Sequence, residues 1–267
     1  MPNLNMFCIC IHDEIFHKIK SLNYIPVGLG ENINNPGWLR DNTLDNISQK
    51  NKFYGEYTFH YWFWKNQLMK ENNRDWTGFC AYRRFWLKKN SKPYEINNLK
   101  NDILNEVPNE WEKYETIIGN KFELTGIKLM KLLKYGKISF LRNPKALFKS
   151  GRSIRFQFDM FHGNGVLDKA IDVLDEKERD GFRKFVIEKN SYNQGNMFIC
   201  KSKNIMDEYY KTIFRWLEKL EDIYGFNNDS YSSTRIYAFL AERFLPYWFN
   251  KYTKCLEWPI GFHDTTN

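Results

Sequence analysis

The sequence has no long hydrophobic run and no recognisable leader. A helix that crosses a membrane needs about 18 or more consecutive apolar residues, so we expect none here. The N-terminal residues lack a basic segment followed by an apolar one, so we also expect no signal peptide. The five cysteines are odd in number and show no zinc-type spacing, which predicts buried thiols in a reducing compartment. We therefore expect a cytoplasmic protein.

Several catalytic signatures are also missing. The sequence contains no Walker A motif, dinucleotide-binding glycine fingerprint, HExxH or GxSxG. A compact DxD motif, with which nucleotide-sugar enzymes usually hold a divalent cation, is absent as well. We therefore predict no metal-ligating residues, and we leave Mg²⁺ or Mn²⁺ open as a cofactor.

Acidic residues are missing between positions 124 and 158, where cations alternate with apolar side chains. This pattern predicts a basic helical insertion. Its surface could bind the anionic inner face of a membrane as a peripheral contact over residues 128–155, each cation contributing about 1 kcal/mol. It could equally pack on the main domain as a solvated insertion. The cations are Lys128, Lys131, Lys134, Lys137, Arg142, Lys145, Lys149, Arg152 and Arg155.

The net positive charge of the chain indicates anionic partners. The formal net charge is +8 and 18% of the residues are aromatic, which suits a nucleotide, a nucleic acid or an acidic membrane surface. No nucleic-acid-binding signature accompanies the charge, so we predict no nucleic-acid partner. A chain of 267 residues is long enough for one large domain, and we expect a single domain over residues 1–267.

Strand and helix patterns alternate along the chain, which predicts an α/β fold with a mostly parallel central sheet and flanking helices. Short apolar runs predict strands at residues 5–11, 25–30, 76–81, 115–119 and 196–200. Longer patterns predict helices at residues 54–69, 207–220 and 235–248.

Polar residues follow two of these strands. His12 and Asp13 come after the first, and Tyr82, Arg83 and Arg84 come after residues 76–81. Ligands of parallel sheets bind outside the carboxyl ends of the strands, so these residues predict a site. A guanidinium group can clamp a phosphate, although neighbouring residues on a strand point to opposite faces and only one arginine should reach the ligand. The alternative is a surface ion pair.

Each of the other candidate site residues has a functional and a structural interpretation. Asp41, Asn42, Asp45 and Asn46 could bind a ribose, sugar or base, or they could cap a helix and hold a loop. Glu56 and His60 are four apart on a predicted helix, which favours a structural pair. His162, in a glycine-rich turn before Asp168, could contact a ligand or be structural. Glu242 could act as a general base, or as a charge partner of Arg235 or Arg243.

Six segments of the sequence match a known family pattern. They are Tyr24-Ile25-Pro26-Val27-Gly28, Asp41-Asn42-Thr43-x-Asp45-Asn46-Ile47-Ser48 with Asn51 and Glu56, Tyr61-Trp62-x-Trp64-Lys65-Asn66, Gly78-Phe79-Cys80-x-Tyr82-Arg83-Arg84-Phe85, Asn196-Met197-Phe198-Ile199 and Arg235-x-x-x-Phe239-Leu240-x-Glu242-Arg243. In these segments, and over nearly its whole length, the sequence resembles the DUF4422 family of bacterial polysaccharide glycosyltransferases. Two residues depart from the family pattern: Ala81 stands where a histidine is usual, and Leu44 where a glycine is usual.

The resemblance implies a GT-A-like (Rossmann-like) glycosyltransferase of capsule or O-antigen (lipopolysaccharide) synthesis. Its donor would be a UDP-sugar, with galactofuranose as one candidate sugar, and its acceptor a lipid-linked oligosaccharide at the inner membrane. Arg83 and Arg84 would stabilise the leaving diphosphate, and Glu242 or Asp168 would be the base. The alternative is a non-catalytic sugar- or nucleotide-binding relative, which Ala81 favours. The predicted substrate-binding residues, taken from the sequence patterns and the resemblance together, are Asp41, Asn42, Asp45, Asn46, Lys65, Tyr82, His162, Asn196, Arg235 and Arg243.

Overall fold

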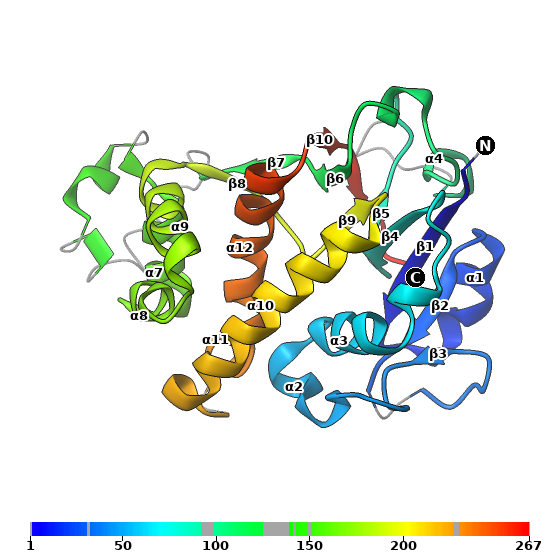
Figure 1. Cartoon of the computed structure of the whole chain (residues 1–267), viewed down its shortest axis with the longest axis horizontal. Helices are drawn as coiled ribbons and strands as arrows, with labels where there is room; N and C mark the ends of the chain where they lie inside the picture. The colour runs from blue at the N-terminus through cyan, green and yellow to red at the C-terminus, as the bar shows by residue number, and fades with distance from the viewer. Residues whose placement is uncertain are drawn as a thin grey trace. The chain divides into compact units, whose positions relative to one another are not determined.

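The computed structural model describes residues 2–30, 33–91, 99–124, 139–140, 143–148, 151–226 and 230–266, and Figure 1 shows the chain. The chain forms two compact units, which are described separately. Unit 1 comprises residues 1–120, 195–211 and 249–267, and unit 2 comprises residues 121–194 and 212–248. The expectation of one domain over residues 1–267 stays a prediction.

Unit 1 is built on a mixed sheet, which confirms the predicted α/β class with a mostly parallel centre. In the strand order β10-β6-β9-β4-β1-β2-β3, every pair is parallel except the two pairs made by β9. β5 pairs antiparallel with both β4 and β11. The strands are β1 (Leu4–Cys10), β2 (Ile25–Gly28), β3 (Leu39–Arg40), β4 (Trp76–Ala81), β5 (Arg84–Trp86), β6 (Thr116–Gly119), β9 (Phe198–Cys200), β10 (Cys255–Trp258) and β11 (Ile260–Phe262).

Helices cover both faces of β1, which explains its unbroken apolar sequence. Cys8 and Cys10 belong to the same buried cluster as Phe16 of α1 (Phe16–Ser21), which lies on one face. On the other face, the ring of Phe7 lies 5.2 Å from that of Phe63 in α3 (Tyr57–Asn66). The remaining short helices of unit 1 are η1 (Asp13–Ile15), η2 (Ser48–Lys50), α2 (Asn51–Tyr54), η3 (Leu68–Lys70), α4 (Leu99–Asp102) and η4 (Asn109–Trp111).

Residues 51–70 form three helices, α2, α3 and η3, instead of the single helix expected over residues 54–69. Gly55 has a positive φ of 56° and separates α2 from α3. A residue with that φ cannot continue a right-handed helix, and glycine adopts it without a Cβ penalty. The expected burial is observed, because Phe59 and Phe63 of α3 have no exposed surface.

The cysteines are free thiols, and four of them are buried as predicted, whereas Cys255 is half-buried. Cys8 lies beside Cys80 in the parallel register of β1 and β4. Burial raises the pKa of the Cys200 thiol to about 11, so this group stays protonated at neutral pH.

Gly78 of β4 is a packing requirement. A Cβ added there would lie 2.8 Å from Cε of Met6 and 2.9 Å from Cγ1 of Ile199. We predict that Gly78→Ala lowers the free energy of unfolding by about 1–3 kcal/mol, because extra volume in a packed core forces neighbours to move. Chemical denaturation measures this loss. Adding Met6→Ala should recover part of it, and strictly additive losses would contradict the packing explanation.

Unit 2 contains an antiparallel ribbon of β7 (Lys121–Glu123) and β8 (Ser191–Asn193) together with several helices. Its helices include η6 (Pro144–Leu147), α7 (Ile154–His162), α8 (Val166–Asp172), α9 (Glu176–Glu188) and α11 (Tyr231–Thr234). Two long helices contribute residues to both units: α10 (Lys203–Tyr224) and α12 (Ile236–Tyr252). Both confirm predicted helices and extend them by a few residues at one or both ends.

Most of the predicted basic insertion lies outside the described residues, including Lys128, Lys131, Lys134, Lys137, Arg142 and Lys149. Of the other cations, Arg152 is buried, and Arg155 forms an ion pair with Asp168. Lys145 is exposed. Arg152 and Arg155 are thus engaged within unit 2, and the membrane contact of the segment stays a prediction.

Candidate functional site

The carboxyl ends of β1 and β4 lie side by side, as predicted, because the two strands are parallel neighbours in the sheet. The rings of His12 and Tyr82, which follow these strands, lie 5.0 Å apart. The backbone N–H of Tyr82 donates to the carbonyl of Ile9 at 3.0 Å, which ties the two ends together. This edge of unit 1 therefore gathers polar residues from distant parts of the sequence.

Arg83 and Arg84 occupy different environments. The chain turns after Ala81, so Arg84 begins the antiparallel strand β5 and its side chain is exposed. Arg83 lies in the turn, where its guanidinium packs 5.0 Å from the Tyr82 ring. Its Nε donates to Oδ1 of Asp264 at 3.2 Å. Arg83 is therefore not on a strand, and which of the two arginines reaches a ligand stays a prediction.

Asp41 follows β3 and is only 2% exposed. Its Oδ2 has no hydrogen-bond partner among the described residues. Burial raises the pKa of the carboxyl group, and this outweighs the opposing effects of the Thr58 hydroxyl and of Arg40. Arg40 itself supports the loop before it, donating to the carbonyls of Ile33 and Gly30. Asp41 is therefore a buried carboxyl group, and one of its oxygens lacks a hydrogen-bond partner among the described residues.

The loop after Asp41 is attached to α3. Trp62 Nε1 donates to the Thr43 hydroxyl at 3.0 Å, and the Tyr61 hydroxyl donates to Asp45 at 3.3 Å. Asn46 accepts from the backbone and hydroxyl of Ser48, so its side chain holds the loop, which was its structural alternative. Asn42 is exposed on the same loop.

Leu44 has a positive φ of 53° and is 74% exposed. This is the position at which the family pattern has glycine, and that backbone conformation favours glycine. On α3, the Nζ atom of Lys65 lies 3.7 Å from the ring centroid of Trp64, so the amine stacks on an aromatic face.

Asn196 joins Glu56 and His60, which were expected to pair with each other. Its Nδ2 donates to Glu56 Oε1 at 2.8 Å, and its backbone carbonyl oxygen lies 3.3 Å from His60 Nε2. The other ring nitrogen of His60 lies 3.0 Å from the Tyr210 hydroxyl. Burial lowers the pKa of His60 to about 3, so the ring is neutral. Asn196 is thus bonded to α3 and to its N-cap residue, Glu56.

Unit 2 holds a second polar group around Arg243, which is 2% exposed. Its guanidinium donates to Glu242 and to Oε1 of Gln157, and it lies 4.7 Å from the Tyr192 ring. Its Nε has no hydrogen-bond partner in the part of the chain that the structure describes. Glu242 is therefore a charge partner of Arg243, and its role as a general base stays a prediction.

His162 lies beside this group. Its ring is 4.1 Å from that of Phe239 and 4.6 Å from that of Phe158. Burial, with a contribution from the Arg243 charge, lowers its pKa to about 3. Its Nδ1 is buried and bonds to none of the described residues. Arg235 is half-buried and follows α11.

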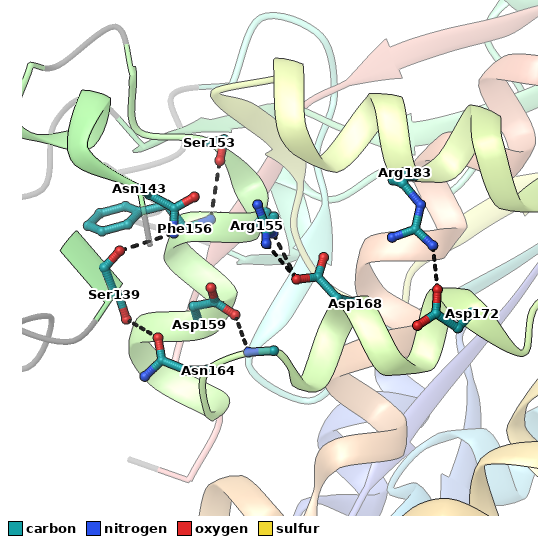
Figure 2. Close-up of polar contacts among 11 residues, drawn as sticks. Ser139, Asn143, Ser153, Arg155, Phe156, Asp159, Asn164, Asp168, Asp172 and Arg183 are labelled. Carbon is teal, nitrogen blue, oxygen red and sulfur yellow. Dashed lines mark hydrogen bonds and ion pairs between the residues drawn. The ribbon is translucent and has the colours of Figure 1, made fainter. Parts of the chain in front are cut away.

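Asp168 is held by an arginine in unit 2, as Figure 2 shows. Its Oδ2 accepts from Nε and Nη2 of Arg155, at 3.0 and 2.6 Å. The glycine-rich turn before it is fixed by Asp159, whose Oδ1 accepts from the N–H of Gly165 at 2.9 Å. Gly163 and Gly165 both have positive φ, which explains their place in the turn.

The predicted residues therefore form separate groups. Unit 1 contains Asp41, Asn42, Asp45, Asn46, Lys65, Tyr82, Arg83, Arg84 and Asn196, and unit 2 contains His162, Asp168, Arg235, Glu242 and Arg243. The sequence reasoning missed Asp264 and Gln157. No local pattern could have indicated them, because Asp264 is 181 residues from its partner Arg83 and Gln157 is 86 from Arg243.

A cavity of about 850 Å³ opens at the opposite edge of the sheet, near the amino ends of β1 and β4. Its lining includes Asn3, Asn73, Trp76 and Lys201, and none of the predicted site residues. Within the described ranges, no three His, Cys, Asp or Glu side chains gather as a metal ion would require. Among those same residues, no helix is both long and apolar enough to span a membrane.

The fold is shared with a solved structure described as "WbbM bifunctional glycosytransferase apo structure", with a TM-score of 0.64 and 20% sequence identity. The match covers 97% of this chain and 45% of the solved chain, so this chain spans less than half of that protein. The family model DUF4422, a domain of unknown function, matches residues 7–254, and the chain belongs to this family. No curated protein matches this chain.

Proposed function

We propose that this chain is a glycosyltransferase that moves a sugar from a nucleotide-sugar donor to a glycan acceptor. The observation that carries the proposal is the carboxyl edge of the sheet in unit 1. There, Asp41 has a buried oxygen with no hydrogen-bond partner in the described part of the chain, and Arg83 offers a guanidinium group next to the ring of Tyr82. This edge is where open α/β sheets bind nucleotides. The fold of a solved protein whose title names a glycosyltransferase supports the same assignment.

The two side chains suit the two ends of such a donor. The Asp41 carboxyl group can bond to a hydroxyl group of the ribose or sugar. The Arg83 guanidinium remains charged at every physiological pH and can bind two phosphate oxygens at once. During transfer, the acceptor oxygen attacks the anomeric carbon while the bond from that carbon to the diphosphate oxygen breaks. Negative charge then develops on the leaving diphosphate, and Arg83 would stabilise it in place of a metal ion.

The acceptor hydroxyl must lose a proton to a base, and Glu242 and Asp168 stay the candidates predicted from the sequence. Each of these carboxylates accepts a hydrogen bond from an arginine of unit 2. The choice between them is part of the proposal.

The finer features of the proposal rest on the family resemblance and the net charge of +8. The donor would be a UDP-sugar, with galactofuranose as a candidate. The acceptor would be a lipid-linked oligosaccharide of capsule or lipopolysaccharide synthesis. The protein would work in the cytoplasm, at the inner face of the membrane, and the basic stretch would supply a peripheral contact.

A second candidate function is nucleotide-sugar binding without transfer. The observation that favours it is Ala81, the last residue of β4, because the family pattern has histidine there. An alanine at the edge that carries Tyr82 and Arg83 removes a group that could bond to substrate or take part in the chemistry.

The proposal predicts a selective response to UDP and its sugars in a thermal-shift screen that also includes GDP, CMP and their sugars. A ligand at about 100 times its Kd stabilises the folded state by about 2.7 kcal/mol, which corresponds to a rise in Tm of roughly 5–10 °C. Release of UDP from a UDP-sugar in the presence of acceptor would then show transfer.

Each outcome of this screen separates the alternatives. Stabilisation without UDP release favours the binding protein. The absence of any response to all three nucleotides and their sugars contradicts both functions. Full activity in excess chelator is expected if Arg83 replaces a metal ion, whereas a loss that Mn²⁺ restores would contradict that role.

A further inference from the structure

Asp264 lies in the segment after β11 and contacts the turn that carries Arg83. Its Oδ1 accepts three hydrogen bonds: from Nε of Arg83 at 3.2 Å, from the backbone N–H of Thr266 at 3.1 Å and from the Thr266 hydroxyl at 2.7 Å. The two Thr266 bonds and the Arg83 charge lower the pKa of the Asp264 carboxyl group. The group is therefore a fixed, ionised acceptor.

The segment around Asp264 is attached to the turn by its neighbours as well. The Thr265 hydroxyl donates to the Tyr82 carbonyl at 2.7 Å, and Lys18 Nζ donates to the Thr265 carbonyl at 3.0 Å. The backbone N–H of His263 donates to the Arg83 carbonyl at 3.2 Å. Thr265 is only 3% exposed. Asp264 is thus placed by bonds on both sides of it in the sequence.

This arrangement leaves the outer part of the Arg83 guanidinium available. Asp264 takes only Nε, and Nη1 and Nη2 have no hydrogen-bond partner among the residues that the structure describes. The Arg83 side chain is 43% exposed, so a ligand can approach it from solvent. A planar guanidinium held at Nε keeps its two terminal N–H groups in the parallel geometry that binds two phosphate oxygens.

We propose that Asp264 is a positioning residue, which holds Arg83 by Nε so that Nη1 and Nη2 bind the diphosphate of the donor. The inference rests on the proposed function. Asp264 does not touch the phosphate. It reduces the number of conformations that Arg83 loses on binding, because the side chain is already restricted before the ligand arrives.

The opposite role would be competition, in which the carboxylate occupies the place of the phosphate. Two features favour positioning. The contact uses one of the five N–H groups of the guanidinium, so four remain for a ligand. The accepting oxygen is also fixed by two bonds to Thr266, which would hold it in place when a phosphate binds. The two roles predict changes of opposite sign when the carboxylate is removed.

The test compares the binding of UDP and of uridine, by calorimetry, to the full chain and to Asp264→Ala. We expect the Kd for UDP to rise on the order of tenfold, equivalent to about 1.4 kcal/mol, and the Kd for uridine to stay the same. In an Arg83→Ala background, Asp264→Ala should have no further effect on UDP. Asp264→Asn should lie between the wild type and Asp264→Ala, since its amide oxygen can still accept from Nε.

Asp172→Ala is the matched control, because Asp172 forms an exposed ion pair with Arg183 in unit 2. It should leave both Kd values unchanged. Tighter UDP binding by Asp264→Ala would identify the carboxylate as a competitor and overturn the proposal. Unchanged UDP binding, or an equal loss for UDP and uridine, would also overturn it while leaving the proposed function intact. A wild-type chain that binds neither compound would contradict both.

Discussion

Replacement of Arg243 by methionine is expected to lower the free energy of unfolding by about 3–5 kcal/mol, the scale for removing one partner of a buried ion pair. Arg243 is 2% exposed and bonds to Glu242 and Gln157. Without the guanidinium, a carboxylate and an amide oxygen lose their partner in a low-dielectric environment. Chemical denaturation followed by circular dichroism measures the loss.

Two variants make this measurement specific. Arg183→Met removes an arginine from the exposed pair with Asp172, and it should cost less than about 1 kcal/mol. Adding Glu242→Gln to Arg243→Met should recover part of the loss, because it removes the charge that the arginine had compensated. Equal losses for Arg243→Met and Arg183→Met would show that the buried group of unit 2 contributes nothing beyond a surface pair.

Replacement of Asp41 by asparagine is expected to change how stability depends on pH. Burial raises the pKa of Asp41 in the folded protein above its value in the unfolded chain. Protonation therefore favours folding, so the wild type is most stable relative to Asp41→Asn at low pH. That advantage is lost as the pH rises through the folded pKa. At neutral pH, Asp41→Asn should be the more stable protein by about 1–3 kcal/mol, the scale for an unsatisfied buried polar group.

Thermal unfolding of both proteins between pH 4 and pH 8 tests this sign, with Asp45→Asn as a control for losing a charge on the exposed loop. A stability difference between Asp41→Asn and the wild type that is independent of pH would contradict the interpretation. The same variant should lose most of its stabilisation by UDP if Asp41 bonds to the donor. If UDP stabilises Asp41→Asn as much as the wild type, Asp41 does not belong to the proposed site.

Much of the fold could be predicted because its signals are local. The unbroken apolar sequence of β1 indicated a strand covered on both faces, and the structure confirms this. The amphipathic pattern over residues 207–220 likewise predicted a helix, and the structure confirms it as α10. The antiparallel direction of β9 could not be read from the sequence, since a buried strand looks the same in either direction. The break at Gly55 was missed because one glycine was outweighed by the aromatic residues on both sides of it.

The candidate site was also predictable only where its signals are local. The position of Tyr82 after a buried strand was sufficient to predict that it lies at the carboxyl edge of the sheet, where its ring contacts that of His12. The partners of Tyr82 and Arg83 were not predictable, because the contacts depend on which distant segments the fold brings together. Asn196 was expected to bind substrate, and the structure shows its amide bonded to Glu56.

The sequence by itself determined the α/β class, the family and the chemical types available for a site: cations, carboxyl groups and amides on a basic chain. These features follow from residue type and local spacing, which tertiary structure does not alter. Only the tertiary structure decided which of those groups are already paired and which have an open bonding position. Burial and long-range contacts distinguish Asp41, with a free oxygen, from Asp168, held by Arg155. The same contacts attach Arg83 to Asp264, because pairing depends on distances in space.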